Sequence, residues 1–127
     1  MEYTYDFGDG PFDLIVTVSG AASAQEMMLL RGELLGDPRL RPGMNVLYDL
    51  TGIDARGLTT DDLRELADDG RRFEPLGRHA VALVAPKPLA FGLGRMFEAF
   101  AANVHLADHV HVAESVDDAY AWLAGLR

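Results

Sequence analysis

The sequence of 127 residues contains no cysteine. This absence excludes disulfide bonds, thiolate nucleophiles and cysteine-ligated metal sites, and it is typical of proteins in a reducing compartment. Long apolar runs are also missing, since none approaches the roughly 20 residues of a membrane-spanning helix. Met1 to Asp6 lacks the basic start and apolar core of a signal peptide. We therefore predict a cytoplasmic protein without a transmembrane segment.

Positive charge is scarce as well. Eleven Lys and Arg face 20 Asp and Glu, the net charge is −9, and Lys87 is the single lysine. Such a field repels phosphate backbones, so nucleic acid is excluded as an expected partner. Hydrophobic residues make up 49% and charged residues 24%, which is ordinary for a folded protein. A chain of this length favours one core, and we predict a single domain spanning residues 1–127.

Short apolar segments predict five strands. The first two form a hairpin, because alternating segments flank the turn residues Gly8 to Pro11. A continuous apolar run after Pro42 and Gly43 is typical of a strand buried on both faces, which belongs at the centre of a sheet. The predicted strand segments are 3–7, 12–18, 44–50, 79–85 and 109–113.

Apolar residues at helical spacing predict four helices. Capping residues mark their starts at Ser23, at Thr59 or Thr60, and at Ser115. The third helix is expected to open around Gly92 and Gly94. The order ββαβαβαβα predicts an α/β fold in which an N-terminal β-hairpin leads into a mostly parallel five-stranded sheet with four helices.

Two segments carry a resemblance to a known family. They are Val46 to Gly52 on the central strand and Phe91 to Phe97 at the third helix. With this element order, the chain resembles the STAS domain superfamily and, more narrowly, its SpoIIAA-like branch, which is related to the CRAL-TRIO lipid-binding fold. The resemblance implies a SpoIIAA-like fold over nearly the whole chain. It also implies a non-enzymatic, regulatory or adaptor function that acts through protein contacts.

The same resemblance raises the hypothesis that this chain carries the phosphorylation switch of some STAS proteins. Anti-sigma-factor antagonists carry a phosphorylatable serine in an Asp-Ser-Ser-Gly-like turn after the central strand. Counted from Asp49, that turn falls on Gly57 to Thr60, where the acidic residue and the leading serine are missing. Thr59 and Thr60 are the remaining candidate hydroxyls, but a threonine before Asp-Asp-Leu suits a helix N-cap. We favour the capping role.

Gly92 and Gly94 form a short glycine motif between a predicted strand and a helix. Phe97 stands where a dinucleotide-binding loop would have its third glycine, so a packing role is favoured over nucleotide binding, and no cofactor is predicted. A smaller hypothesis is that free amides at this helix start, with Lys87 and Arg95 nearby, hold a small anion or carboxylate. The alternative for Arg95 is a solvated ion pair with Glu98, one turn away.

Three histidines lie close together in the sequence, at His105, His109 and His111. Spacing of two along a strand places His109 and His111 on one face, which makes them weak candidates for a zinc or other transition-metal site. The favoured interpretation is polar residues on an exposed edge strand, with no metal.

Four aspartates cluster in sequence around the carboxyl end of the central strand, where open α/β sheets place ligands. For these residues we favour solvation and helix capping, and no serine has the context of a nucleophile elbow, so no catalytic residue is predicted. The four aspartates are Asp49, Asp54, Asp61 and Asp62. An unrecognised enzyme using Asp49, Arg95 or the histidines is the second alternative to a function through protein contacts.

The first alternative to a function through protein contacts is a binder of a small apolar or amphipathic ligand in a pocket between the third helix and the sheet, lined by Phe91, Met96 and Phe100. The full set of candidate ligand-binding residues is Lys87, Phe91, Gly92, Gly94, Arg95, Met96 and Phe100. A homodimer is also predicted, through Tyr3, Tyr5 or Ile15, if helices leave one sheet face uncovered.

Overall fold

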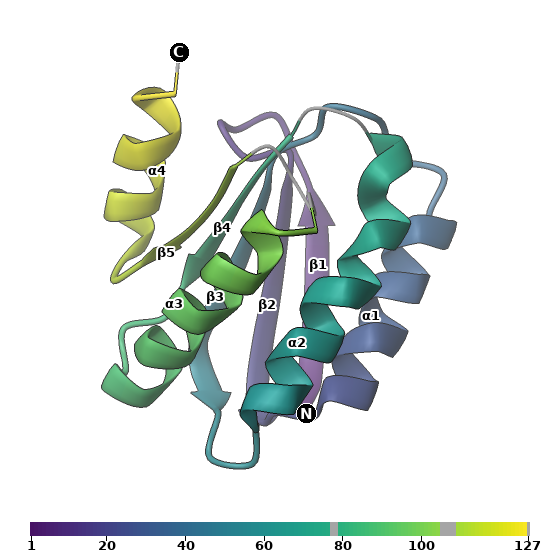
Figure 1. The fold of residues 1–127 in the computed structure, drawn as a ribbon. Coiled ribbons are helices and arrows are strands. Elements are labelled where there is room, and N and C mark those ends of the chain that lie inside the picture. Colours follow the sequence, from purple (N-terminus) through teal and green to yellow (C-terminus); the bar gives the residue numbers. More distant parts are fainter. Residues whose placement is uncertain (77–78, 105–108, 127) are drawn as a thin grey trace.

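The computed structural model describes residues 1–76, 79–104 and 109–126. Within them, five strands form one sheet in the order in which they occur along the chain (Figure 1). β1 (Glu2–Phe7) pairs antiparallel with β2 (Leu14–Ala21), and β3 (Val46–Asp54), β4 (Ala80–Val84) and β5 (His109–Ala113) follow in parallel. The predicted hairpin and mostly parallel sheet are confirmed, and β3 is the central strand.

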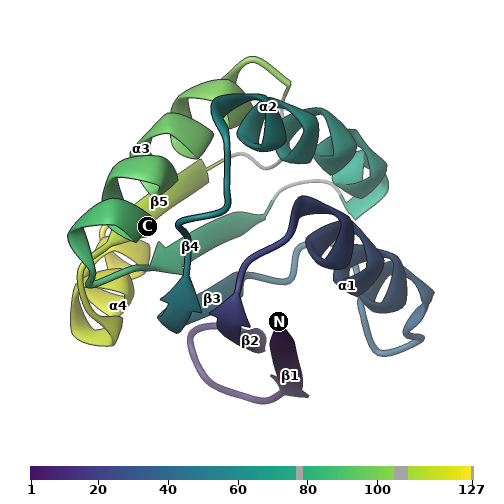
Figure 2. The ribbon, with the colours of Figure 1, turned by 90° about the horizontal axis from the view of Figure 1, so that it is seen from below.

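Four α-helices of the described residues cover the sheet unequally. α1 (Ala24–Gly36), α2 (Thr60–Asp69) and α3 (Pro88–Ala102) lie on one face, whereas α4 (Val116–Ala124) lies on the other (Figure 2). Each of the first three helices connects neighbouring parallel strands, and the strand order does not reverse. Right-handed crossovers therefore place all three on the same face.

The helix starts follow the capping pattern in three cases. Ser23 accepts a hydrogen bond from the amide of Glu26, and Ser115 accepts one from the amide of Asp118. Thr59 caps α2, as described below. α3 differs, because it begins at Pro88, before the predicted start at the glycine motif. The fixed φ of proline suits the first helical position, and Phe91 already donates its amide to the carbonyl of Lys87.

A segment of tighter helix directly follows α2. α2 stops at Asp69, and a 3₁₀ helix (Gly70–Leu76) continues in its place. Phe73 and Leu76 of this segment are buried in the main core, so the chain still supplies an inward apolar face after α2 ends.

The core has two parts, one on each face of the sheet. The larger lies between the sheet and α1–α3, and it includes Val16 and Phe97. The smaller lies beneath α4, where Leu47 and Val84 meet Leu123. α4 packs on β4 and β5, which leaves the same face of β1 and β2 to the exposed side chains of Glu2, Thr4, Asp6 and Thr17.

The aromatic residues of β1 face the helices. Tyr3 and Tyr5 pack against the larger core, and the Tyr3 hydroxyl donates to Glu33 Oε1 of α1 at 2.6 Å. Only Ile15, of the three residues predicted to form a dimer contact, belongs to the other face. The prediction was wrong about Tyr3 and Tyr5, because the register Tyr3–Val18 and Tyr5–Val16 places them beside inward-facing residues of β2.

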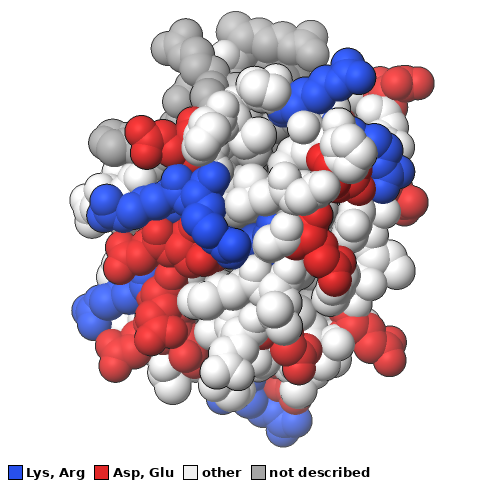
Figure 3. Space-filling view, turned by 90° about the vertical axis from the view of Figure 1, so that its right-hand side faces the viewer, with Lys and Arg blue, Asp and Glu red and all other residues white. Residues whose placement is uncertain are grey.

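The surface beside α1 and α2 mixes charges of both signs around an uncharged band (Figure 3). On α2 and the segment after it, arginines pair with aspartates three residues away, as in Arg64–Asp61 and Arg72–Asp69. Exposed pairs of this kind contribute little to stability.

Candidate functional site

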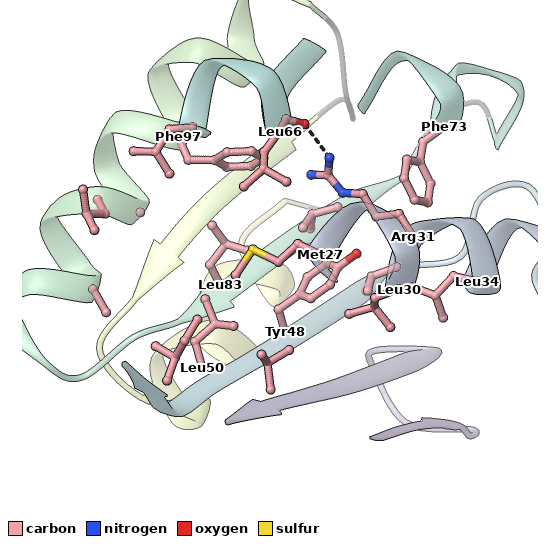
Figure 4. Close-up of a pocket in the computed structure, with 18 of the residues that line it drawn as sticks. Met27, Leu30, Arg31, Leu34, Tyr48, Leu50, Leu66, Phe73, Leu83 and Phe97 are labelled. Carbon is pink, nitrogen blue, oxygen red and sulfur yellow. Dashed lines mark hydrogen bonds between the residues drawn. The ribbon is translucent and has the colours of Figure 1, made fainter. Parts of the chain in front are cut away.

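The most distinctive feature of the interior is an apolar cavity of about 120 Å³ between the sheet and α1–α3 (Figure 4). Its floor comes from inward-facing side chains of β2, β3 and β4, such as Val18, Leu50 and Leu83. Its roof comes from the apolar stripes of the helices, including Leu30 and Leu63. Protein interiors are ordinarily close-packed, with few voids larger than a water molecule, so a cavity of this size is a candidate binding site.

The cavity is partly open to solvent. Leu50, Leu58 and Leu93 line it and are partly exposed, and they gather where β3 leads towards α2. We place its entrance there. This is the carboxyl end of the parallel strands, where open α/β sheets usually receive ligands.

Arg31 is the polar group at the opposite end. Its side chain is 10% exposed, and its guanidinium lies 5.8 Å from the ring centres of both Phe73 and Phe97. Nη1 donates to the carbonyl of Leu66 and, at 3.2 Å, to Oδ2 of Asp69. These contacts tie α1 to the end of α2, and they hold the cation at the cavity wall (Figure 4).

Asp69 is shared between two guanidiniums. Arg72 Nη2 lies 2.8 Å from the same Oδ2 atom that Arg31 contacts. Burial alone would raise the pKa of Asp69, but the hydrogen bonds from Arg72 and Arg31 outweigh it and lower that pKa below the usual value. Asp69 is therefore ionised at neutral pH.

Tyr48 and His79 complete the polar lining. In Figure 4 the Tyr48 hydroxyl points from β3 towards Arg31. Burial raises the pKa of Tyr48, and the charge of Arg31 and hydrogen bonding with it offset only part of the rise. The phenol is therefore protonated at neutral pH and is available as a donor. His79 is 6% exposed and lines the wall just before β4.

The predicted pocket residues of α3 lie differently from the expected arrangement. Ala90, Leu93, Gly94 and Phe97 line the cavity from this helix, so Gly94 is the one member of the predicted set that does so. α3 begins earlier than expected, at Pro88. The side of this helix that faces the sheet carries Ala90 and Gly94, and Gly94 lies close to β5.

The other members of that set lie around the helix. Phe91 and Phe100 pack at the margin of the main core, and Phe100 lies under the guanidinium of Arg64 at 5.1 Å. Met96 is half-buried outside the lining. Three members are exposed, namely Lys87, Gly92 and Arg95.

The anion hypothesis at the glycine motif does not fit the geometry. Gly92 and Gly94 lie inside α3, so their amides are not the free amides of a helix start. Lys87 Nζ lies 3.5 Å from the carbonyl of Ile53. Oε2 of Glu98, the residue considered as a partner of Arg95, accepts the amide of Val112 at 3.0 Å.

Gly94 has a packing function. A Cβ at this position would lie 2.7 Å from Cγ2 of Val112, a distance that real contacts do not reach. The glycine thus lets α3 approach β5 closely, as predicted. Gly92 has open space around it.

Thr59 is the N-cap of α2. Its hydroxyl accepts the amide of Asp62 at 3.1 Å, and the Asp62 carboxylate accepts the amide of Thr59 at 2.9 Å. This reciprocal capping box confirms the favoured capping role. Thr60 is the first residue of the helix and is exposed.

His109 and His111 lie on β5, an edge strand. His111 stacks on Trp122 of α4, with ring centres 5.0 Å apart. The described residues contain no group of three or more His, Asp or Glu side chains placed to hold a metal ion. His105 lies outside the described residues.

Each of the four aspartates forms hydrogen bonds or an ion pair with residues two or three positions away in the sequence. Asp49 accepts the amide and hydroxyl of Thr51, and hydrogen bonds from Arg56 hold the pKa of Asp54 at about 2. Asp61 pairs with Arg64, and Asp62 belongs to the capping box. None of them lines the cavity.

Arg31, Tyr48 and His79 were not singled out in the sequence. A signal for Arg31 was present, because it follows Met27 by four residues and therefore lies on the apolar stripe of the first helix. Tyr48 alternates with Val46 and Leu50, which places all three on one face of the central strand.

The element order, the sheet with one antiparallel edge strand and the helices on both faces define a SpoIIAA-like α/β fold. A solved structure bears this out: an uncharacterised protein of the DUF3478 family with a SpoIIAA-like fold, from Shewanella loihica PV-4. It has a TM-score of 0.56 and 19% sequence identity, covering 95% of this chain and 93% of that chain. No protein-family model and no curated protein matches the sequence. In the described residues, no helix has the length and apolar character to cross a membrane.

Proposed function

We propose that this protein binds a small, largely apolar molecule in the cavity between the sheet and α1–α3. The observation that carries the proposal is the cavity of about 120 Å³, lined almost wholly by aliphatic and aromatic side chains. An opening at the carboxyl end of β3 and a few polar groups at the far end are the usual features of a ligand site. The relation of SpoIIAA-like folds to lipid-binding folds agrees with this function.

A pair of variants on α3 tests the proposal. Ala90 lines the cavity, whereas Ala99 is exposed on the same helix. Ala90→Leu adds the same atoms as Ala99→Leu, but only the former fills the cavity. Native mass spectrometry would first show whether the purified protein retains a small molecule, and binding of benzene and benzyl alcohol would then be measured by NMR.

We expect the wild-type protein and Ala90→Leu to differ, with binding lost in the filled variant and kept in Ala99→Leu. Filling a cavity without strain commonly preserves or raises stability, so the loss would not reflect unfolding. Equal behaviour of both variants, or no binding to the wild-type protein, would reject the proposal.

A function through protein contacts is the second candidate. Leu29 of α1 and Leu89 of α3 are 68% and 51% exposed, which gives apolar contact points on two helices. Isolated exposed leucines are common on soluble proteins, so this observation ranks below the cavity. The homodimer stays a prediction, and light scattering at micromolar concentration tests it, since a monomeric mass would remove it.

A further inference from the structure

We infer that the ligand is a small monocarboxylate, with its apolar body in the cavity and its carboxylate on Arg31 and Tyr48. The inference rests on the proposed function and adds the chemical class of the molecule. It follows from the sign of the charge at the inner end of the cavity, from the hydrogen-bond donors of Arg31 and Tyr48 and from the size of the space.

The lining is basic in an acidic protein. Although the chain has a net charge of −9, no Asp or Glu is found among the described residues that line the cavity. Its polar side chains are Arg31, Tyr48 and His79. A ligand that carried a positive charge would meet Arg31 without a lining carboxylate to balance it, whereas an anion would be attracted.

The charge of Arg31 is only partly balanced by the protein. Among the described residues, Asp69 is the carboxylate that contacts it, at 3.2 Å, and Asp69 also pairs with Arg72 at 2.8 Å. One carboxylate thus serves two guanidiniums, and a net positive charge remains at this corner. The Arg72 side chain is 42% exposed and is screened by water, but that of Arg31 is 10% exposed, so its charge acts towards the cavity.

Arg31 retains donors for a ligand. Its hydrogen bonds to Leu66 and Asp69 both start from Nη1. A guanidinium has five N–H groups, so donors remain at Nε and Nη2 beyond these two bonds, and the neighbouring Tyr48 hydroxyl also hydrogen-bonds with Arg31. The aromatic rings of Phe73 and Phe97 lie within 5.8 Å and hold the guanidinium in place. Such a preorganised fork matches the two oxygens of a carboxylate.

Tyr48 lies beside this fork. Its hydroxyl points towards Arg31 from the floor of the cavity (Figure 4). A protonated phenol donates a hydrogen bond to an anion but gains less from a neutral alcohol, since bonds to charged groups are the stronger ones. Arg31 and Tyr48 therefore favour a carboxylate over the corresponding alcohol.

The volume limits the apolar body. A protein cavity of about 150 Å³ holds benzene, so the cavity of about 120 Å³ limits the apolar body to at most about one ring or a chain of about six carbon atoms. A longer chain would have to extend past Leu50 and Leu93 into solvent. Benzoate and hexanoate are accordingly suitable probes, and benzyl alcohol and hexanol are their neutral counterparts.

The experiment is an NMR titration of the full chain with these two acid–alcohol pairs at neutral pH. We expect each acid to bind at least about tenfold more tightly than its alcohol. The preference should fall several-fold in Tyr48→Phe, which removes only the hydroxyl, and should disappear in Arg31→Met. Arg95→Met changes an exposed arginine of α3 and should keep it.

The outcomes separate the two proposals. If the alcohols bind as tightly as the acids, the carboxylate inference is overturned while the apolar site stands. If neither the acids nor the alcohols bind, both proposals fail. If Arg31→Met does not fold, the acid–alcohol comparison in the wild-type protein and in Tyr48→Phe decides the question.

Discussion

Gly94 of α3 lies so close to Val112 of β5 that a Cβ on the glycine would come within 2.7 Å of Val112 Cγ2. Val112 is 2% exposed and β-branched, so its side chain has no free direction in which to turn. The contact fixes how near α3 approaches the sheet. It therefore also fixes the part of the cavity roof that α3 supplies.

Replacing this glycine should be costly. Gly94→Ala forces a methyl group into a filled space, and we expect a loss of about 1–3 kcal/mol in the free energy of unfolding. Gly92→Ala is the matched control, because it lies in the same helix with nothing within 4 Å of its Cβ, and it should stabilise the protein by up to about 1 kcal/mol. Urea denaturation measures both. Equal effects of the two substitutions would contradict the close-approach argument.

The N-cap of α2 should contribute measurably to stability. Thr59→Ala removes the acceptor for the amide of Asp62, and we expect the free energy of unfolding to fall by about 1 kcal/mol. Thr59→Ser should retain most of the stability, and Thr60→Ala should change it by less than about 0.5 kcal/mol. If Thr60→Ala proved the more damaging change in thermal unfolding, the assignment of the cap would be wrong.

Asp69 should make stability depend on pH in the acid range. Its pKa in the folded protein lies below the value of about 3.9 expected for the unfolded chain. Its contribution is thus fully present above the unfolded pKa and disappears as the pH falls through the folded pKa. Asp69→Asn should lower the free energy of unfolding by about 1–2 kcal/mol at pH 7, because two arginines lose a charged partner.

The test compares denaturation of wild-type protein and Asp69→Asn from pH 7 downward. The difference between the two free energies of unfolding should begin to shrink at about pH 4. It should vanish once the pH lies below the lowered pKa of Asp69 in the folded protein. Asp68→Asn is the control, since Asp68 is 68% exposed and lies 3.9 Å from Arg71. A difference for Asp69→Asn that stayed constant with pH would show that its effect is not electrostatic.

Zinc is not expected to bind His109 and His111 or to change the stability of the protein. His111 is occupied by stacking on Trp122, and the described residues offer no third ligand near it and His109. We expect equimolar Zn²⁺ to leave the melting temperature unchanged. A rise in melting temperature that vanishes in His109→Ala would instead establish a metal site.

Local patterns in the sequence determined the element order and most of the helix starts. The alternation of β1 and the capping residues Ser23, Thr59 and Ser115 act over a few residues, so they can be recognised without knowledge of the fold. Pro88 is also a local signal, since proline suits the first helical position, whereas the glycine motif after it favours a later start of α3.

The site was decided by the tertiary structure. Arg31 and Asp69 are 38 residues apart, and Tyr48 comes from a third element, so no spacing in the sequence brings them together. The cavity depends on the distance at which three helices settle on the sheet, and the Gly94–Val112 contact helps to fix that distance. The sequence by itself determined which residues are apolar and in what order helices and strands form, because those are properties of neighbouring residues. Packing alone decided where space remains and which polar groups face it.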